Sequence, residues 1–256
     1  MDAILDEAIC LRRREVRERD LIVCYLTREH GKLSLVAKGV RRAASRNAPL
    51  CQPCALVRIQ HVAGHGLGTL TQGELLDSLY DLRADLWRSA YATYLCELAD
   101  HALPEGEPHA VVHDLLRATL CGLLVAADGA ALVHSCELRL LGELGWEPVL
   151  DHCARCGEAF GEEAAVYCPD AGGLLHESDH DPRDPALPVS PEVVRALRRL
   201  LRPDAYGLDL TAIHIPAAVA AGVREVTRAH LRCHLDLVPK SLAFLDRLRS
   251  LDPEAT

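Results

Sequence analysis

The strongest constraint on how this chain folds is a change of hydrophobic period near Asp81. Before it, apolar residues alternate or run in short segments between glycines and turns, which is typical of β-strands. After it, they recur at intervals of three and four, which is typical of α-helices. The chain is therefore expected to begin as a β-domain and to continue as a helical one. The segments with strand character are residues 8–12, 21–27, 33–37, 55–62 and 68–72.

These short strands predict a small closed barrel. Gly31 and Gly39 supply bends, while Pro49 and Pro53 fall between the expected strands, where a missing amide donor does no harm. The five-stranded OB barrel fits this pattern, and its common use is to bind oligonucleotides on one face and in its loops. We expect an α+β protein with an N-terminal five-stranded OB-type β-barrel over residues 1–80, followed by an all-helical domain.

The helical domain is expected in two parts, residues 81–150 and 189–256. A small Cys/His zinc-finger-like insertion with a proline-rich connector separates them over residues 151–188. Ser190 followed by Pro191 is a strong helix start, because serine caps the first amides and proline suits the first helical position. Helices are predicted over residues 86–102, 111–126, 130–144, 191–201, 216–235 and 240–250.

The insertion contains ligands suited to one structural zinc ion. Cys153 and Cys156 have the two-residue spacing with which a tight turn grips a tetrahedral ion. The return half lacks a second such pair, so Cys168 and His176 are the expected remaining ligands, because thiolate and imidazole suit zinc better than a carboxylate. The competing interpretation is a metal-free turn whose thiols pack as small hydrophobes. Alternative ligands are Asp179 and His180.

The charge of the chain is unevenly distributed. The net charge is −9, but residues 1–62 carry 12 Lys and Arg against 7 Asp and Glu. Basic clusters are the electrostatic footprint of proteins that bind phosphate backbones, although a small cluster can also be an ordinary solvated face. We interpret the barrel as DNA-binding, with the loop after residue 37 as the main contact. The candidate contacts are Arg28, Lys32, Lys38, Arg41, Arg42, Arg46 and Arg58.

Aromatic residues are scarce in the expected barrel. Tyr25 and Tyr80 are the only ones in its 80 residues. Base stacking, worth ~1–3 kcal/mol per base in single-strand binders, therefore cannot dominate the affinity. Backbone electrostatics instead predict weak sequence preference, strong salt dependence, and binding of both single and double strands.

The eleven cysteines favour a reducing cytoplasm over a secreted disulfide scaffold, because their number is odd and no signal peptide precedes them. No apolar run reaches the ~20 residues that span a bilayer, so no membrane partner is expected. Cys51 and Cys54 form a second Cys-x-x-Cys pair, which lies between a basic loop and a strand instead of opening a helix. We interpret them as core or turn thiols, with redox or metal roles as the less favoured alternative.

The order of several segments along the chain is informative: residues 31–42, 67–74, 137–148, 153–156, 170–175, 230–235 and 240–245. Together they resemble the RecO family of bacterial DNA repair proteins. The likeness extends over nearly the whole chain, from the basic barrel to the C-terminal helices. The sequence departs from the family at the metal site, where family members with a metal have a second Cys-x-x-Cys in place of His176 and Asp179.

The resemblance implies a recombination mediator of the RecF pathway. Such a protein would bind single- and double-stranded DNA without sequence preference, anneal complementary strands, and assist RecA loading on strands coated by single-strand binding protein. Its implied partners are RecR, the acidic C-terminal tail of single-strand binding protein and, indirectly, RecA, at the bacterial nucleoid. No catalytic residue or nucleotide cofactor is expected, and the chain lacks the GxxxxGK[ST] and HExxH motifs of nucleotide and zinc enzymes.

Two further interpretations stay open. The acidic tail is expected to dock on the helical domain, beside leucines at 197, 200 and 201, unless this helix only has a solvated basic face. The alternative function is a sequence-specific transcription regulator, which would need a base-reading helix, whereas the basic residues fall in strands and loops. The candidate partner-binding residues are Arg195, Arg198, Arg199 and Arg202.

Overall fold

The computed structural model describes residues 3–64, 66–160, 165–207, 209–235 and 239–251. The chain divides into two compact units, each with its own hydrophobic core. Unit 1 comprises Met1–Leu124 and Pro239–Asp252, and unit 2 comprises Val125–Val238 and Pro253–Thr256. Among the described residues, no helix is both long and apolar enough to cross a lipid bilayer.

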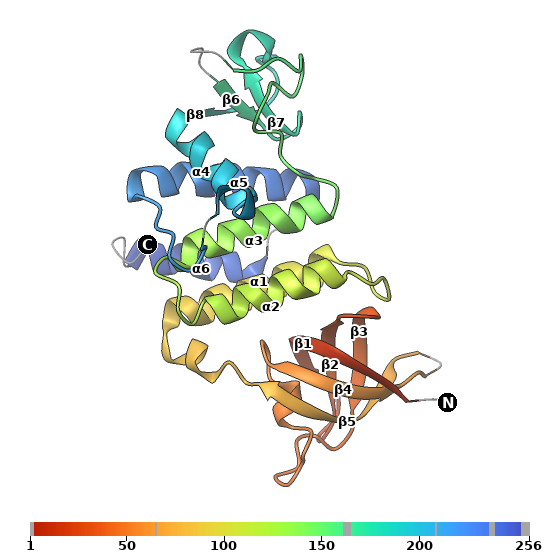
Figure 1. Cartoon of the computed structure of the whole chain (residues 1–256). Coiled ribbons are helices and arrows are strands. Elements are labelled where there is room, and N and C mark those ends of the chain that lie inside the picture. Colours follow the sequence, from red (N-terminus) through yellow and green to blue (C-terminus); the bar gives the residue numbers. More distant parts are fainter. Residues whose placement is uncertain (1–2, 65, 161–164, 208, 236–238, 252–256) are drawn as a thin grey trace. The chain divides into compact units, whose positions relative to one another are not determined.

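A closed barrel of five strands begins unit 1 (Figure 1), and the predicted barrel is confirmed. All neighbouring strands are antiparallel except β3 and β5, which pair in parallel. The long first strand pairs with two neighbours, and a shift of register between Cys10 and Arg12 bends it. In barrel order the strands are β1 (Ile4–Glu15), β2 (Leu21–Thr27), β3 (Gly31–Ala37), β5 (Gly68–Asp77) and β4 (Leu56–Val62).

The barrel interior is filled by apolar side chains, which along β4 alternate with partly exposed ones. Tyr25 is fully buried there and its hydroxyl donates a hydrogen bond to the Leu50 carbonyl at 3.1 Å. Gly31 makes the turn into β3 with φ of +72°, and a Cβ at this position would lie 1.9 Å from the Glu107 carbonyl oxygen. Only glycine fits both the left-handed backbone and this close approach.

Three helices complete unit 1: α1 (Leu86–Ala102), α2 (Ala110–Gly122) and α6 (Lys240–Leu251). Asp85 caps α1 by accepting a hydrogen bond from the Arg88 amide at 2.8 Å. The C-terminal α6 packs against α1, where Glu97 accepts the amide of Lys240 at 2.9 Å. The carboxylate therefore satisfies an amide at the exposed N-terminal end of α6.

Unit 2 is built on α3 (Gly129–Glu143), α4 (Pro191–Leu201) and α5 (Ala217–Leu235), which pack on one another. The predicted start of α4 is confirmed, since Ser190 accepts the Val193 amide and Pro191 is the first helical residue. Asp128 caps α3 and also accepts the amide of Ile215 at 3.1 Å. This second bond fixes the chain before α5 to the start of α3.

The sequence pattern did not predict a small antiparallel sheet in unit 2. It consists of β6 (Ala165–Cys168), β7 (Gly173–His176) and β8 (Leu187–Val189), in the order β7-β6-β8. Strands of three and four residues are too short to show a reliable alternation. The last of them falls on the expected connector, whose extended conformation is thus part of a sheet edge, where proline is tolerated.

Short 3-10 segments occur at Pro49–Cys51, Tyr80–Ala84, Glu177–Asp179 and Asp204–Tyr206. The six predicted helices are confirmed within a few residues at their ends, except that α2 ends at Gly122, four residues before the expected 126. Of these helices, α1, α2 and α6 belong to unit 1, and α3, α4 and α5 belong to unit 2. The domain boundaries near residues 80, 150 and 188 stay a prediction.

Candidate nucleic-acid interface and metal centre

A basic surface lies where the β1–β2 turn meets the loop after β3. The Asp20 carboxylate accepts the Gly39 amide at 2.7 Å, and the Arg19 carbonyl accepts the Arg41 amide at 3.2 Å. Within the loop, the Arg42 carbonyl accepts the Ser45 amide at 3.0 Å, and similar turns continue toward Pro49. The loop is therefore a chain of hydrogen-bonded turns attached to the neighbouring hairpin.

Three of the predicted DNA contacts stand out on this surface because they are exposed and unpaired. Within the described residues, Lys38, Arg42 and Arg46 have neither an ion pair nor a side-chain hydrogen bond. An exposed cation without a protein partner can meet a phosphate without first breaking an ion pair. These three residues are therefore the strongest candidates of the predicted set.

The other predicted contacts are engaged with carboxylates. Arg28 pairs with Asp114 at 3.0 Å and with Glu29 at 2.9 Å, and Arg41 pairs with Glu15 at 2.8 Å. Such partners partly neutralise the cations, and a phosphate would have to displace them. Arg58 pairs with Glu7 and Glu74, and Lys32 pairs with Asp100.

Sequence reasoning missed three arginines that extend the surface. Arg14, Arg17 and Arg19 flank or form the β1–β2 turn, are exposed, and have no side-chain partner among the described residues. Their signal in the sequence was the run Arg12-Arg-Arg-Glu-Val-Arg-Glu-Arg19, whose interspersed glutamates masked it. We define the basic surface by six residues: Arg14, Arg17, Arg19, Lys38, Arg42 and Arg46.

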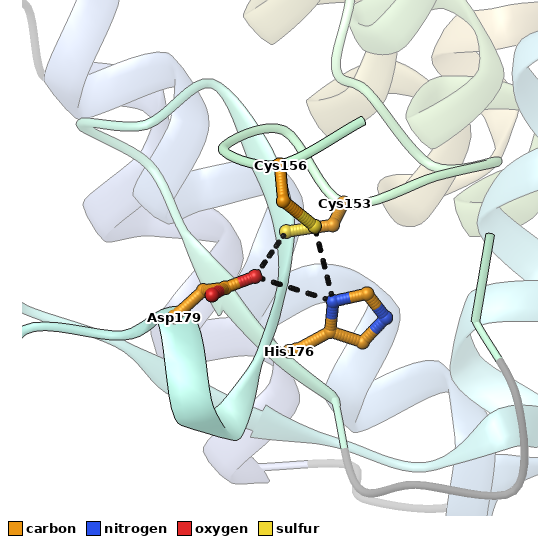
Figure 2. Close-up of side chains that lie close together, drawn as sticks. All are labelled: Cys153, Cys156, His176 and Asp179. Carbon is orange, nitrogen blue, oxygen red and sulfur yellow. Dashed lines mark hydrogen bonds and ion pairs between the residues drawn. The ribbon is translucent and has the colours of Figure 1, made fainter. Parts of the chain in front are cut away.

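A second candidate site lies in unit 2, where four potential metal ligands converge (Figure 2). One ligand atom from each of Cys153, Cys156, His176 and Asp179 lies within 4.8 Å of the others. The Cys156 sulfur is 3.4 Å from His176 Nδ1, and Asp179 Oδ2 is 3.3 Å from both His176 Nδ1 and the Cys153 sulfur. Two sulfurs, one imidazole nitrogen and one carboxylate oxygen form a donor set that suits tetrahedral coordination.

Backbone hydrogen bonds position the two cysteines. The Cys153 amide donates to the Glu158 carbonyl at 2.8 Å, and the Gly157 amide donates to the Cys153 carbonyl at 2.9 Å, which closes a tight turn. Gly157 has φ of +79°, a left-handed conformation that glycine adopts without strain. The fold therefore forms the two-cysteine turn through its own backbone.

The thiols of the cluster have opposite pKa shifts. Burial raises the pKa of Cys153, but amides of Cys156, His176 and Arg155 stabilise the thiolate, and the net shift is downward. For Cys156, the Glu158 amide lowers the pKa, but the nearby Asp179 carboxylate is among the groups that raise it to about 11. Negative charge on the Cys153 sulfur and on Asp179 thus disfavours deprotonation of Cys156. A bound cation would stabilise both thiolates.

Cys168 and His180 do not join the group. In the β6–β7 ladder Cys168 pairs with Gly173, while His176 pairs with Ala165, so the two predicted ligands lie at opposite ends, roughly 10 Å apart along the strands. Cys168 is instead fully buried with Leu175 in the core beneath the turn. His180 hydrogen-bonds the Asp184 carbonyl at 2.9 Å. Asp179, considered only as an alternative, completes the group.

The four arginines of α4 have different surroundings. Arg198 donates to the Leu150 carbonyl at 2.9 Å, Arg202 pairs with Asp151 at 2.7 Å, and Arg195 pairs with Glu192 at 2.8 Å. Within the described part of the chain, Arg199 has no such partner. It lines a groove of about 580 Å³ whose apolar wall contains Leu200, Ile213, Ile215 and Val219. Leu197 and Leu201, expected in the groove, are core residues.

The barrel topology and its basic surface define a protein of the oligonucleotide-binding barrel class. The family profile described as recombination protein O N terminal matches residues 1–79, and the profile described as recombination protein O C terminal matches residues 83–243. The chain belongs to the RecO family of DNA repair proteins.

Individual relatives agree with this assignment. DNA repair protein RecO of Symbiobacterium thermophilum is 36% identical over 247 residues, which cover 95% of this chain and 97% of the relative. RecO of Desulforudis audaxviator is 36% identical over 244 residues, or 94% and 96% of the two chains. RecO of Bacillus subtilis is 30% identical over 249 residues, or 96% and 94%.

We expect reduced full-length protein to bind one equivalent of cobalt(II) and to show the absorption of a tetrahedral, sulfur-coordinated ion. Cys156→Ser should abolish this absorption, because it removes one of the two thiolates. The controls Cys168→Ala and Cys233→Ser should bind normally, since neither residue belongs to the group. Binding below about a tenth of an equivalent, or loss of the signal in folded Cys168→Ala, would contradict the assignment.

Proposed function

We propose that this protein is a recombination mediator of the RecF pathway. It binds DNA through contacts with the phosphates of the DNA backbone and anneals complementary strands. The observation that carries the proposal is the basic surface, whose six exposed cations have no side-chain partner in the described part of the chain and lie on an OB-type barrel. The scarcity of aromatics supports the same conclusion, because Tyr25 is buried in the core and cannot stack on a base, while the exposed Tyr80 lies after the last barrel strand, in the 3-10 segment Tyr80–Ala84. Phosphate contacts alone carry no sequence information.

Annealing follows from the same electrostatics. Two complementary strands repel each other through their phosphates, and each cation that neutralises a phosphate lowers this repulsion. If Lys and Arg of the basic surface contact two strands together, base pairing then supplies the driving force and the fidelity. The mechanism requires no bond cleavage, and we propose that the protein is not an enzyme.

Further partners are proposed from family membership. They are RecR, the acidic C-terminal tail of single-strand binding protein and, indirectly, RecA, whose loading on coated strands the protein would assist. Since the substrate would be chromosomal DNA, we place the activity at the bacterial nucleoid. The cysteine, histidine and aspartate cluster is proposed to hold one structural zinc, because its four protein groups would fill the positions of a tetrahedral ion and leave none for a catalytic water.

The groove on α4 is the proposed dock for the acidic tail. Its wall is apolar on one side, and Arg199 at its edge has no partner among the described residues, so a carboxylate could bind there while apolar side chains enter the groove. Arg198 and Arg202 are less suited, because both are tied to residues 147–151. Arg199 is therefore the first candidate of the four predicted arginines. Arg195 also lines the groove, but a carboxylate would have to displace Glu192 from it.

The docking proposal predicts that Arg199→Ala weakens binding of a tail peptide about tenfold or more, because a hydrogen bond between charged groups is lost. Arg183→Ala serves as the control, since Arg183 is exposed but does not line the groove. Fluorescence anisotropy of a labelled peptide on full-length protein measures both. Equal losses in the two variants, or no loss in either, would contradict the assignment.

The DNA proposal predicts that replacing Lys38, Arg42 and Arg46 together by Ala weakens single- and double-strand binding alike and slows annealing of complementary oligonucleotides. The matched control, Arg28→Ala with Arg58→Ala, removes two barrel cations that are already paired with carboxylates, so its effect should be much smaller. Circular dichroism verifies that both variants fold. An unchanged annealing rate in the triple variant, or a larger loss in the control, refutes the proposed surface.

A further inference from the structure

Cys54 and Cys96 form a close thiol pair that DNA binding does not use. Their sulfur atoms are 3.6 Å apart, although the residues are 42 positions apart in the chain. Cys54 ends the turn before β4, and Cys96 lies in the middle of α1. Both belong to unit 1, where α1 packs against the barrel. A disulfide needs the sulfurs to approach to about 2.05 Å, which is a small movement for two side chains.

The spacing in the sequence suggests a different pair, Cys51 with Cys54. The structure separates these two thiols. Cys51 is 1% exposed and turns into the barrel core, where its sulfur lies 3.7 Å from the Tyr25 hydroxyl and 3.4 Å from the Asn47 carbonyl. Cys54 has φ of +68°, a conformation that reverses the chain direction, and its sulfur meets α1 instead. The partner of Cys54 is therefore Cys96.

The two sulfurs differ in access and in acidity. Cys54 is half-buried and lines a cavity of about 170 Å³ together with Arg83 and Thr93, whereas Cys96 is 1% exposed. A hydrogen bond from the Cys96 thiol, with help from Arg83, lowers the pKa of Cys54. The same hydrogen bond and burial raise the pKa of Cys96. A low thiol pKa and an open path are the two properties that mark an oxidisable cysteine.

We propose that Cys54 is a peroxide-reactive thiol and that Cys96 converts its oxidised form into a reversible disulfide. The cavity has room for a molecule of peroxide size, since a water in the liquid occupies only about 30 Å³. Cytosolic disulfides of this kind are transient and serve redox sensing more often than architecture.

The chemistry balances with hydrogen peroxide as the oxidant. The Cys54 thiolate attacks one peroxide oxygen, the O–O bond breaks, and hydroxide leaves, which gives Cys54 sulfenic acid. The Cys96 sulfur then attacks the Cys54 sulfur, the S–O bond breaks, and the departing hydroxide takes the Cys96 proton to leave as water. Peroxide gains the two electrons that the two thiols lose. A dithiol reductant reverses the change by thiol–disulfide exchange.

The product would tie the barrel covalently to α1. Cys54 precedes β4, and Cys96 belongs to the helix that packs on the barrel. The bond would therefore join the barrel to α1 and enclose the chain between Cys54 and Cys96 in one covalent loop. Cross-links over such distances restrict the unfolded chain and stabilise the folded one. Oxidation would thereby hold the barrel on α1 until the thiols are reduced.

Peptide mapping tests this proposal on the reduced full-length protein. After treatment with one equivalent of hydrogen peroxide and alkylation of the remaining thiols, mass spectrometry should find peptides joined through Cys54 and Cys96 that separate with dithiothreitol. In Cys96→Ser, dimedone should label Cys54 as a sulfenic acid. In Cys54→Ser, Cys96 should stay unlabelled, because it is buried.

The control Cys233→Ser removes an exposed thiol outside the pair and should leave the cross-link intact. A cross-link between Cys51 and Cys54 would overturn the proposal, because it would show that the pair in the sequence, and not the pair in the fold, reacts. Oxidation confined to the exposed thiols of Cys156 and Cys233, with Cys54 and Cys96 still reduced, would overturn it as well.

Discussion

A buried carboxylate on α1 pairs with two cations of the barrel. Asp100, with a side chain 8% exposed, contacts Arg12 of β1, the Cys24 thiol of β2 and Lys32 of β3. The Lys32 side chain is itself only 11% exposed. Breaking a buried pair of this kind costs about 3–5 kcal/mol, because the remaining charge is left without compensation. The contact therefore holds three strands against the helix and removes Lys32 from the surface available to DNA.

Strand register also pairs a further barrel cation with carboxylates. It aligns Arg58 with Glu7 on one neighbour and with Glu74 on the other, so that both carboxylates can reach its guanidinium. Cross-strand pairs of opposite charge stabilise a sheet by a few tenths of a kcal/mol to about 1 kcal/mol. The barrel cations of the basic surface lie at the β1–β2 turn and in the loop after β3. There, among the described residues, no strand partner supplies a carboxylate to Arg42 or Arg46.

The sequence predicted the barrel and the positions of the helices well, because both depend on local signals: hydrophobic period, turn glycines and caps such as Ser190. It did not predict which cations are free, since the pairing of Arg58 depends on strand register, which is a property of the whole sheet. The metal group shows the same limit. Cys168 had the better ligand chemistry, but the β6–β7 register puts it at the far end of the hairpin from His176, and Asp179 occupies the nearer position.

We propose that DNA is held through its phosphates by unpaired cations on the barrel. The most direct measurement is the affinity of the full-length protein for several unrelated single- and double-stranded sequences over a range of salt concentrations. We expect affinities that agree within a few-fold among sequences. The logarithm of the binding constant should fall linearly with the logarithm of the salt concentration, by about 0.9 per duplex phosphate contacted. A strong preference for one sequence, or an affinity that salt does not change, would contradict it.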